Sequence, residues 1–355
     1  MFSIYFEGLG GFLELKYIAM EKDNERTVKS ILKSELGISQ RMLKRLKQNS
    51  GIDAGIYINS QPVYVNYKVK PGDVVYVHMN FNDNCEDIVP ENIKIDILYE
   101  DEYLLVINKA PDMVVHPTAL HQSGTVANAI MYHLSQKGVN IKVRPVTRLD
   151  RDTSGVIVFA KNPYIQNALA IQMSERTFLK EYIGIVWGVV NENKGTINLP
   201  IDRKPDSIML RHVSETGKPS ITNYEVIRRF ENATLLKFSL ETGRTHQIRV
   251  HCQAINHPLI GDTMYWKWIS DIDLVIQKYN FYPHDEAIIC NLHENQYCDD
   301  YLFYKYKFVN SMFIQRQALH SYRIRFIHPV TNNELDIIAP LHDDMKKALE
   351  ILENK

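Results

Sequence analysis

The sequence predicts an α+β fold, in which a mixed sheet with flanking helices follows a small α+β N-terminal domain. From residue 93 onward, short apolar runs of strand length, such as 95–99 and 103–107, are interspersed with helical stretches at about 126–137 and 163–176. The two kinds of segment do not alternate regularly along the chain. This order favours a mixed sheet over a doubly wound parallel one.

The length and composition are those of an ordinary globular protein. The 355 residues suffice for two domains, and hydrophobic residues make up 45% and charged residues 23% of them. No apolar run approaches the roughly 20 residues needed to cross a bilayer, and the N-terminus lacks the features of a signal peptide. The four scattered cysteines are typical of reduced thiols. We therefore expect a cytoplasmic protein that binds no membrane.

The charge is distributed unevenly. The formal net charge is −1, but residues 22–47 hold eight Lys/Arg against three Asp/Glu, and residues 266–300 hold two against seven. A basic end and an acidic segment predict that one surface binds an anion while another avoids it.

Residues 21–80 are expected to form the small N-terminal domain. Thr27 and Ser39 can each cap a short helix, and Gly37 ends the first of them. The second helix points its cations outward, and these are Arg41, Lys44, Arg45 and Lys47. Taken alone, such a basic face is typical of a solvated surface. Short strands are expected at 56–59, 63–65 and 73–77.

The remaining boundaries follow from composition. Residues 1–20 are expected to be an N-terminal extension, 81–92 a polar linker, 93–345 the main domain, and 346–355 a C-terminal tail.

A charged, turn-forming segment at 144–155 runs directly into the apolar run 156–160. This arrangement holds a carboxylate, Asp150, at the rigid edge of a buried strand. Arg148 and Arg151 flank it, and neighbouring guanidinium groups favour the charged form of a carboxylate. On composition alone, a surface loop whose side chains make turn hydrogen bonds is an equal alternative.

Two further segments alternate in the manner of strands. The first, 178–188, carries Tyr182 and is explained equally well by sheet packing. In the second, 240–251, alternation places Arg249 and His251 on one face and His246 on the other, which argues against a metal site made by the two histidines.

Together the motifs resemble those of the large-subunit-type (RluA/RluD-like) RNA pseudouridine synthases. The matching segments, in the family's order, are Arg-Leu-Asp-x-x-Thr-Ser-Gly at 148–155, Lys-x-Tyr at 180–182, Thr-Gly-Arg-Thr-His-Gln-Ile-Arg-Val-His at 242–251 and Arg-Gln-Ala-Leu-His at 316–320. One position departs from the pattern, because Thr147 stands where the family usually has His. The resemblance covers about 93–265 and 316–345.

The N-terminal domain resembles the small RNA-binding domain named after the fourth ribosomal small-subunit protein. The likeness rests on 37–44, on Ile58-Asn59 and on 72–75. Ser60 stands where that family has Gly, and the loop 49–55 is longer than usual.

These resemblances imply an isomerase that converts uridines of ribosomal RNA, or alternatively transfer RNA, to pseudouridine. The catalytic sheet should be mainly antiparallel and the protein a monomer. Asp150 is the implied catalytic carboxylate, acting either as a nucleophile or as a base. Tyr182 would stack on the flipped-out base, and Arg249, or failing that Arg244, would pair with Asp150. Arg148 would fill the gap that the base leaves. The reaction involves no redox change, so neither a cofactor nor a metal is expected.

About 50 residues, 266–315, form an insertion relative to the family. His284, Cys290, His293 and Cys298 lie within it, but their spacing fits no standard zinc site, so we expect an extra subdomain without metal.

Three other functions compete with this interpretation. An inactive RNA-binding or RNA-chaperone relative stays open because of Thr147. A methyltransferase would need a glycine-rich cofactor loop, which the sequence lacks. A glycoside hydrolase would need a paired carboxylate, for which Asp152 is the nearby candidate.

Overall fold

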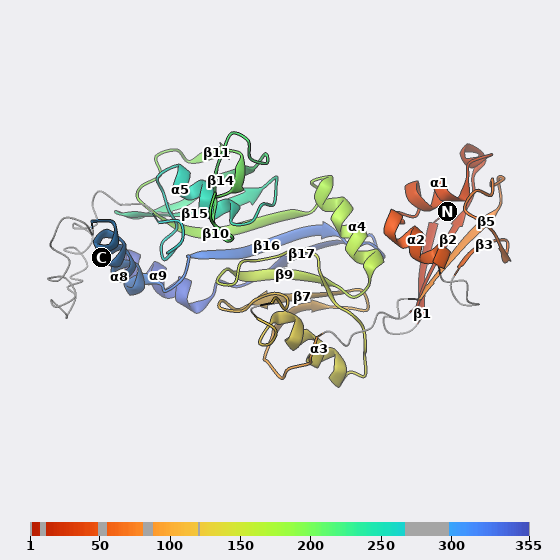
Figure 1. The fold of residues 1–355 in the computed structure, drawn as a ribbon, viewed down its shortest axis with the longest axis horizontal. Coiled ribbons are helices and arrows are strands. Elements are labelled where there is room, and N and C mark those ends of the chain that lie inside the picture. The colour runs from red at the N-terminus through yellow and green to blue at the C-terminus, as the bar shows by residue number, and fades with distance from the viewer. Residues whose placement is uncertain are drawn as a thin grey trace.

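The computed structural model describes residues 2–7, 12–48, 55–80, 88–119, 121–266 and 298–354. Figure 1 shows a small N-terminal domain at one end of an elongated molecule and a larger domain built on a long sheet. The larger sheet has ten strands, and among the described strand pairs all are antiparallel except one. The predicted α+β class with a mixed, mainly antiparallel sheet is therefore confirmed.

The N-terminal sheet has five strands in the order β1-β2-β5-β3-β4. They are β1 (Phe2–Glu7), β2 (Phe12–Ile18), β3 (Gly55–Ile58), β4 (Gln61–Pro62) and β5 (Val74–Asn80). The sequence predicts an extension over 1–20, but β2 pairs with β5 along its whole length. Leu13, Leu15 and Tyr17 alternate along β2 and are buried, so this segment supplies one row of the domain's core.

Two short helices in this domain begin at the predicted capping residues. They are α1 (Val28–Ser34) and α2 (Gln40–Gln48), and the 3-10 turn η1 (Glu21–Asp23) precedes them. Thr27 Oγ1 accepts from the Ser30 amide and Ser39 Oγ from the Met42 amide, each at 3.3 Å. Gly37 has a φ of +62°, the left-handed conformation expected of a residue that ends a helix.

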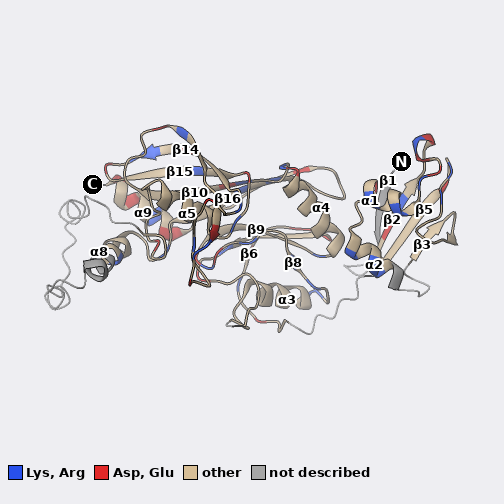
Figure 2. Cartoon of the chain, turned by 45° about the horizontal axis from the view of Figure 1, so that its top comes forward, with Lys and Arg blue, Asp and Glu red and all other residues tan. Residues whose placement is uncertain are grey.

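The outward face of α2 is basic, as the sequence predicts. Arg41, Lys44 and Arg45 are exposed, while Met42 and Leu43 are buried. The side chain of Lys47 lies outside the described residues. Figure 2 shows the cations of α2 on the side of the domain that faces the larger sheet.

The strand predicted at 63–65 is wrong, because β4 covers only Gln61–Pro62. The carbonyls of Val65 and Tyr67 instead accept from the amides of Lys29 and Val28, at 2.9 Å each. These amides belong to the first turn of α1, where they have no intrahelical acceptor. The segment therefore caps a helix instead of extending the sheet.

The turn between β3 and β4 keeps its shape without glycine. Asn59 and Ser60 have φ values of 47° and 68°, and two successive left-handed residues are what the favoured two-residue hairpin turn requires. Asn59 fixes this turn by accepting from the Val74 amide at 2.9 Å and donating to Asp73 at 2.9 Å.

The main sheet runs in the order β11-β14-β15-β10-β16-β9-β7-β6, with β17 paired to β16 and β8 paired to β9. Its strands are β6 (Asp96–Glu100), β7 (Leu104–Lys109), β8 (Arg144–Pro145), β9 (Ser154–Ala160), β10 (Leu179–Trp187), β11 (Lys194–Asn198), β14 (Ile221–Arg229), β15 (Ala233–Leu240), β16 (Leu319–Ile327) and β17 (Glu334–Ile338). A separate two-stranded sheet pairs β12 (Ile201–Arg203) with β13 (Arg211–Val213).

The parallel pair joins β16 to the start of β9 and brings the C-terminal motif beside the loop of Asp150. Ser321 is the register partner of Gly155. A Cβ at Gly155 would lie 2.2 Å from the carbonyl oxygen of Ser321, and its φ is +109°. Only glycine fits this close approach, which explains the Thr-Ser-Gly end of the loop.

Helices α3 (Val126–Gln136) and α4 (Pro163–Ser174) form where the sequence predicts them. The strand expected within 240–251 is wrong, because α5 covers Gln247–Ala254. Residues 247–252 of this helix are all buried, so polar and apolar side chains both point into the protein. In a helix that is buried on all sides, polar residues do not mark a face exposed to solvent. Alternating polar and apolar residues therefore do not indicate a strand here.

The C-terminal region is more ordered than a tail. Helix α9 (Asp343–Glu353) buries Met345, Ala348 and Leu352, so the predicted boundary at residue 346 cuts through a helix. The end of the insertion forms α8 (Cys298–Phe313), whose buried Tyr306 donates to the Leu259 carbonyl at 3.2 Å.

Stability is expected to fall as the pH drops below about 6.5, because of buried His320. Its Nδ1 lies 2.9 Å from Ser154 Oγ and its Nε2 3.3 Å from the Ala339 carbonyl. Burial chiefly lowers the pKa of His320 to about 4, so between pH 6.5 and 4 the unfolded state binds more protons. The loss of stability should reach about 2 kcal/mol by pH 5. The free energy of unfolding in urea should change less between pH 7.5 and pH 5.0 for His320→Gln than for wild type. An equal change in the two proteins would contradict the role of His320.

Candidate active site

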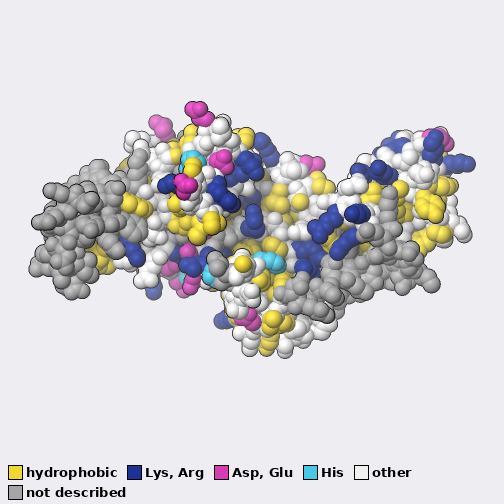
Figure 3. Space-filling model, viewed as in Figure 1, with side chains coloured by type: hydrophobic (Ala, Val, Ile, Leu, Met, Phe, Trp, Pro, Cys, Tyr) yellow, Lys and Arg dark blue, Asp and Glu magenta, His cyan; other side chains and the backbone are white. Residues whose placement is uncertain are grey.

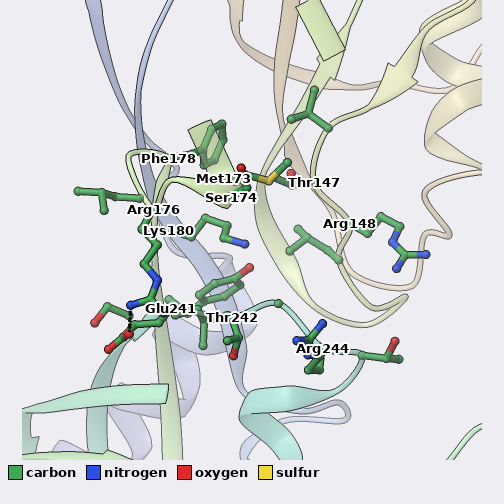
Figure 4. Close-up of a pocket in the computed structure, with 18 of the residues that line it drawn as sticks. Thr147, Arg148, Met173, Ser174, Arg176, Phe178, Lys180, Glu241, Thr242 and Arg244 are labelled. Atoms are coloured by element: carbon green, nitrogen blue, oxygen red, sulfur yellow. Dashed lines mark hydrogen bonds and ion pairs between the residues drawn. The ribbon is translucent and has the colours of Figure 1, made fainter. Parts of the chain in front are cut away.

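A cleft of about 810 Å³ opens where the loop before β9, the start of β10 and the loop after β15 meet. Cationic side chains of Arg148, Arg176, Lys180 and Arg244 line it. Figure 4 shows Lys180 extending into the cavity and Arg176 paired with Glu241, at 2.7 Å. Burial lowers the pKa of Lys180. A cleft lined mainly by one sign of charge favours an anionic ligand.

Asp150 lines this cleft and contacts Arg249, with Arg249 Nη1 3.1 Å from Asp150 Oδ2. Arg249 is only 4% exposed and binds Asp262 through Nε at 2.7 Å and Nη2 at 2.9 Å. Burial alone would lower the pKa of Arg249, but the carboxylates of Asp262 and Asp150 raise it above its usual value. The bidentate bond to Asp262 therefore fixes the cation that orients Asp150.

The carboxylate of Asp262 is held from behind. It is 1% exposed, and its Oδ1 accepts from the amides of Met264 at 3.0 Å and Tyr265 at 3.1 Å. Asn310 of α8 accepts from the neighbouring Gly261 amide. The insertion thus braces the backbone that carries Asp262.

The arginines adjacent to Asp150 in sequence take other positions. Arg151 Nε lies 3.1 Å from Asp152 and 3.4 Å from Asp112, and Arg148 is exposed on the cleft wall. Among the described residues, the arginine that contacts Asp150 is therefore Arg249, whereas Arg151 pairs with Asp152 and Asp112. Arg244 donates from Nε and Nη2 to the Pro219 carbonyl at 3.3 Å, so it has a different partner.

Tyr182 reaches the cleft from β10 and is 7% exposed. Burial, with a smaller effect of the Asp150 charge, raises the pKa of Tyr182 to about 12. The phenol therefore stays protonated at neutral pH. Its ring forms an apolar wall beside the carboxylate.

His246 lies between Asp150 and a chain of hydrogen bonds. The Tyr265 oxygen accepts from the Arg211 amide at 2.8 Å and is hydrogen-bonded to His246 Nδ1 at 2.7 Å. His246 Nε2 lies 3.9 Å from Asp150 Oδ1, which is beyond hydrogen-bond distance. Burial lowers the pKa of His246, although the Asp150 charge opposes this shift. The imidazole of His246 thus faces the second carboxylate oxygen.

Thr147, where the family usually has His, is buried, and its Oγ1 accepts from the Val158 amide at 3.3 Å. The Val146 amide donates to the Val158 carbonyl at 2.8 Å. Thr147 therefore fastens the loop of Asp150 to β9.

Four residues of the site have no predicted role from sequence alone. Lys180 and His246 lie within the motifs, and Asp262 and Tyr265 follow the motif at 242–251. One signal could have found Asp262. A buried arginine needs a carboxylate to balance its charge, and Asp262 follows Arg249 closely in a turn after Gly261. The contact between His246 and Tyr265 depends on a fold that brings α5 against the loop after it, which spacing does not reveal.

Among the described residues, no group of three or more His, Cys, Asp or Glu side chains is placed to hold a metal ion. His284, Cys290 and His293 lie outside those residues, and so does the side chain of Cys298. His251 binds Thr222 and the Leu199 carbonyl, at 2.9 Å each, and so differs in its partners from His246. None of the helices in the described part of the chain has the length and apolar character to cross a membrane.

Comparison with known proteins supports what the motifs imply. Residues 103–254 match the RNA pseudouridylate synthase family. Over 316 residues the chain is 35% identical to the uncharacterized RNA pseudouridine synthase YjbO of Bacillus subtilis (strain 168), with 89% of this chain and 96% of that protein covered. The chain belongs to the RNA pseudouridine synthases. It is thus an RNA uridine isomerase, and the methyltransferase and hydrolase alternatives are excluded.

Other relatives place the synthase in the RluA/RluD-like group. It is 38% identical over 289 residues to the ribosomal large subunit pseudouridine synthase D of Blochmanniella floridana, with 80% and 82% of the two chains covered. Human RNA pseudouridylate synthase domain containing 4 shares the fold, with a TM-score of 0.54 at 21% identity over 72% of this chain and 92% of that one. The family match begins at residue 103, beyond the N-terminal domain, whose RNA-binding role stays a prediction.

Proposed function

We propose that the synthase isomerises specific uridines of ribosomal RNA, with Asp150 as the catalytic carboxylate and the target base flipped into the cleft. The observation that carries this proposal is the placement of the Asp150 carboxylate on buried Arg249 inside a cation-lined cleft. Ribosomal RNA is favoured over transfer RNA because three relatives, at 34–38% identity, are named as ribosomal large subunit pseudouridine synthases.

The two oxygens of Asp150 have different surroundings. Oδ2 is bound by Arg249, whereas Oδ1 faces His246 at 3.9 Å. Oδ1 is therefore the oxygen that meets the ribose. It either attacks the anomeric carbon or removes a proton from the neighbouring ribose carbon, and both routes use an ionised carboxylate. The bond from the anomeric carbon to N1 breaks, a bond to C5 forms, and the C5 proton leaves to solvent.

Tyr182 stacks on the flipped uracil in this proposal. Its ring is buried and its hydroxyl stays protonated, so an aromatic face without charge lies next to the reacting carboxylate. A base can stack on such a face. Lys180 and Arg244 line the same cleft and would contact the phosphates on either side of the target. Flipping costs a few kcal/mol, which these contacts offset.

Replacement of Arg148 by alanine should slow turnover on folded RNA more than on an unstructured fragment. Arg148 is exposed at the edge of the cleft, where its side chain can enter the stack that the base vacates. We expect about a tenfold loss of kcat/KM on the folded substrate and under threefold on the fragment, measured by tritium release. Arg176→Ala, which removes another cation from the cleft lining, is the control, and equal losses of Arg148→Ala on both substrates would contradict the role.

The N-terminal domain would add affinity through α2. Arg41, Lys44 and Arg45 are exposed on one face of this helix, and Lys47 continues the basic run in sequence. Such a face binds phosphates without reading sequence.

The test is tritium release from RNA labelled at carbon 5 of uracil, prepared from cells that lack this gene. Ribosomal and transfer RNA are assayed separately, and the released positions are then mapped. Tritium release from ribosomal RNA alone supports the proposal. Release from transfer RNA alone would show that transfer RNA, and not ribosomal RNA, is the substrate. Binding without release from either would instead support the non-catalytic RNA-binding role.

A further inference from the structure

The N-terminal domain and the main domain meet at the basic face of α2. Asn167 of α4 donates to the Gly37 carbonyl at 2.9 Å, across the boundary between the domains. Buried residues of both domains, including Met42 and Tyr164, belong to one continuous hydrophobic cluster. The position of α2 beside the main domain is therefore fixed by packing.

Three guanidinium groups gather at this boundary. Arg41 and Arg45 are exposed on α2, and Arg144 lies on β8 of the main domain. Burial lowers the pKa of Arg144 to about 10, and the charges of Arg45 and Arg41 add to this effect. Figure 3 shows dark-blue side chains gathered where the two domains meet. A pKa of about 10 leaves Arg144 charged at neutral pH, beside the two cations of α2.

The cluster leads toward the catalytic cleft. Arg144 precedes Arg148 by four residues, so along the chain the two are separated by at most about 14 Å. The intervening residues Val146 and Thr147 already line the cleft that contains Asp150. A single strand that continues beyond the target nucleotide and its neighbours can therefore contact α2, Arg144 and Arg148 together.

We propose that α2 and β8 form one RNA-backbone site, centred on Arg144, through which the strand carrying the target uridine enters the cleft. This inference rests on the proposed function, and it assigns to the main domain a phosphate contact outside the catalytic motifs. Neighbouring cations attract a polyanion and can bind successive phosphates of one strand. The site reads the backbone and not the bases.

The experiment compares binding of two sequence-neutral probes, a 30-nucleotide and a 5-nucleotide oligouridylate, as a function of salt. The variants are Arg41→Gln/Arg45→Gln, Arg144→Gln and Arg144→Lys. The control is Lys29→Gln/Lys33→Gln, which removes two exposed charges from α1 of the same domain. Removal of one cation that binds a phosphate of a single strand should reduce the salt slope of the binding constant by about 0.7.

We expect the α2 pair and Arg144→Gln each to weaken binding of the long probe by about fivefold or more. The short probe should bind within twofold of wild type, and Arg144→Lys should retain binding of the long probe. Wild-type affinity of Arg144→Gln for the long probe would overturn the proposal, as would an equal loss for the α1 control. If Arg144→Gln does not fold, ultraviolet crosslinking of the long probe to wild type must yield peptides from both 40–48 and 142–148. Failure of the proposed function is a separate result, since it appears as absent tritium release by wild type.

Discussion

Asp150→Asn is expected to abolish tritium release while leaving RNA bound. The change keeps the shape of the side chain, and an amide oxygen can still accept from Arg249 Nη1, which lies 3.1 Å from the carboxylate. It removes the charge that either chemical route needs. Loss of a residue that reacts directly lowers turnover by roughly 10⁴-fold or more. Single-turnover tritium release and filter binding of the same RNA separate the two effects.

Asp152→Asn is the matched control for this prediction. Asp152 lies in the same loop, but its carboxylate faces Arg151 at 3.1 Å, and its backbone carbonyl holds the loop by accepting from Arg316 at 2.8 Å. We expect less than a fivefold change in turnover. If Asp152→Asn were as damaging as Asp150→Asn, the loop's conformation would explain the loss. If Asp150→Asn kept more than about 1% of wild-type turnover, Asp150 would not be the reacting carboxylate.

Local sequence signals predicted those parts of the fold in which neighbours in sequence determine structure. The caps at Thr27 and Ser39 formed because a hydroxyl three residues before an amide is sufficient for the bond. These caps could be predicted without knowing the rest of the chain. The need for glycine at Gly155 could not, because it comes from the close approach of Ser321 on a distant strand.

Local sequence patterns gave wrong predictions where contacts with distant segments determine the structure. The alternating residues of 247–252 became a buried helix, because Thr222, Leu199 and Asp262 supply partners for its polar side chains. Residues 12–18 joined the N-terminal sheet because β5 offered a free edge for the whole segment. The pairing of Arg249 with Asp150, 99 residues away, came from the family motif and not from periodicity.

Arg249→Met is expected to be the most destabilising single change in the active site. Arg249 and Asp262 are 4% and 1% exposed, so the substitution leaves a buried carboxylate without its cation. Breaking such a pair costs about 3–5 kcal/mol. Turnover should fall by at least about 100-fold, because Asp150 loses the group that orients it. Urea unfolding and single-turnover tritium release measure the two losses.

The double variant Arg249→Met/Asp262→Asn separates stability from positioning. An asparagine oxygen can still accept from the amides of Met264 and Tyr265, which Asp262 binds at 3.0 and 3.1 Å, but it carries no charge. We therefore expect the double variant to recover about half of the lost stability or more, since no buried charge remains. Turnover should stay as low as in Arg249→Met, because Asp150 is still without its cation. Recovery of both stability and turnover would show that Arg249 serves only to neutralise Asp262.

Arg244→Met is the control for stability. This arginine donates to the Pro219 carbonyl at the surface, so its replacement should change the free energy of unfolding by less than about 1 kcal/mol.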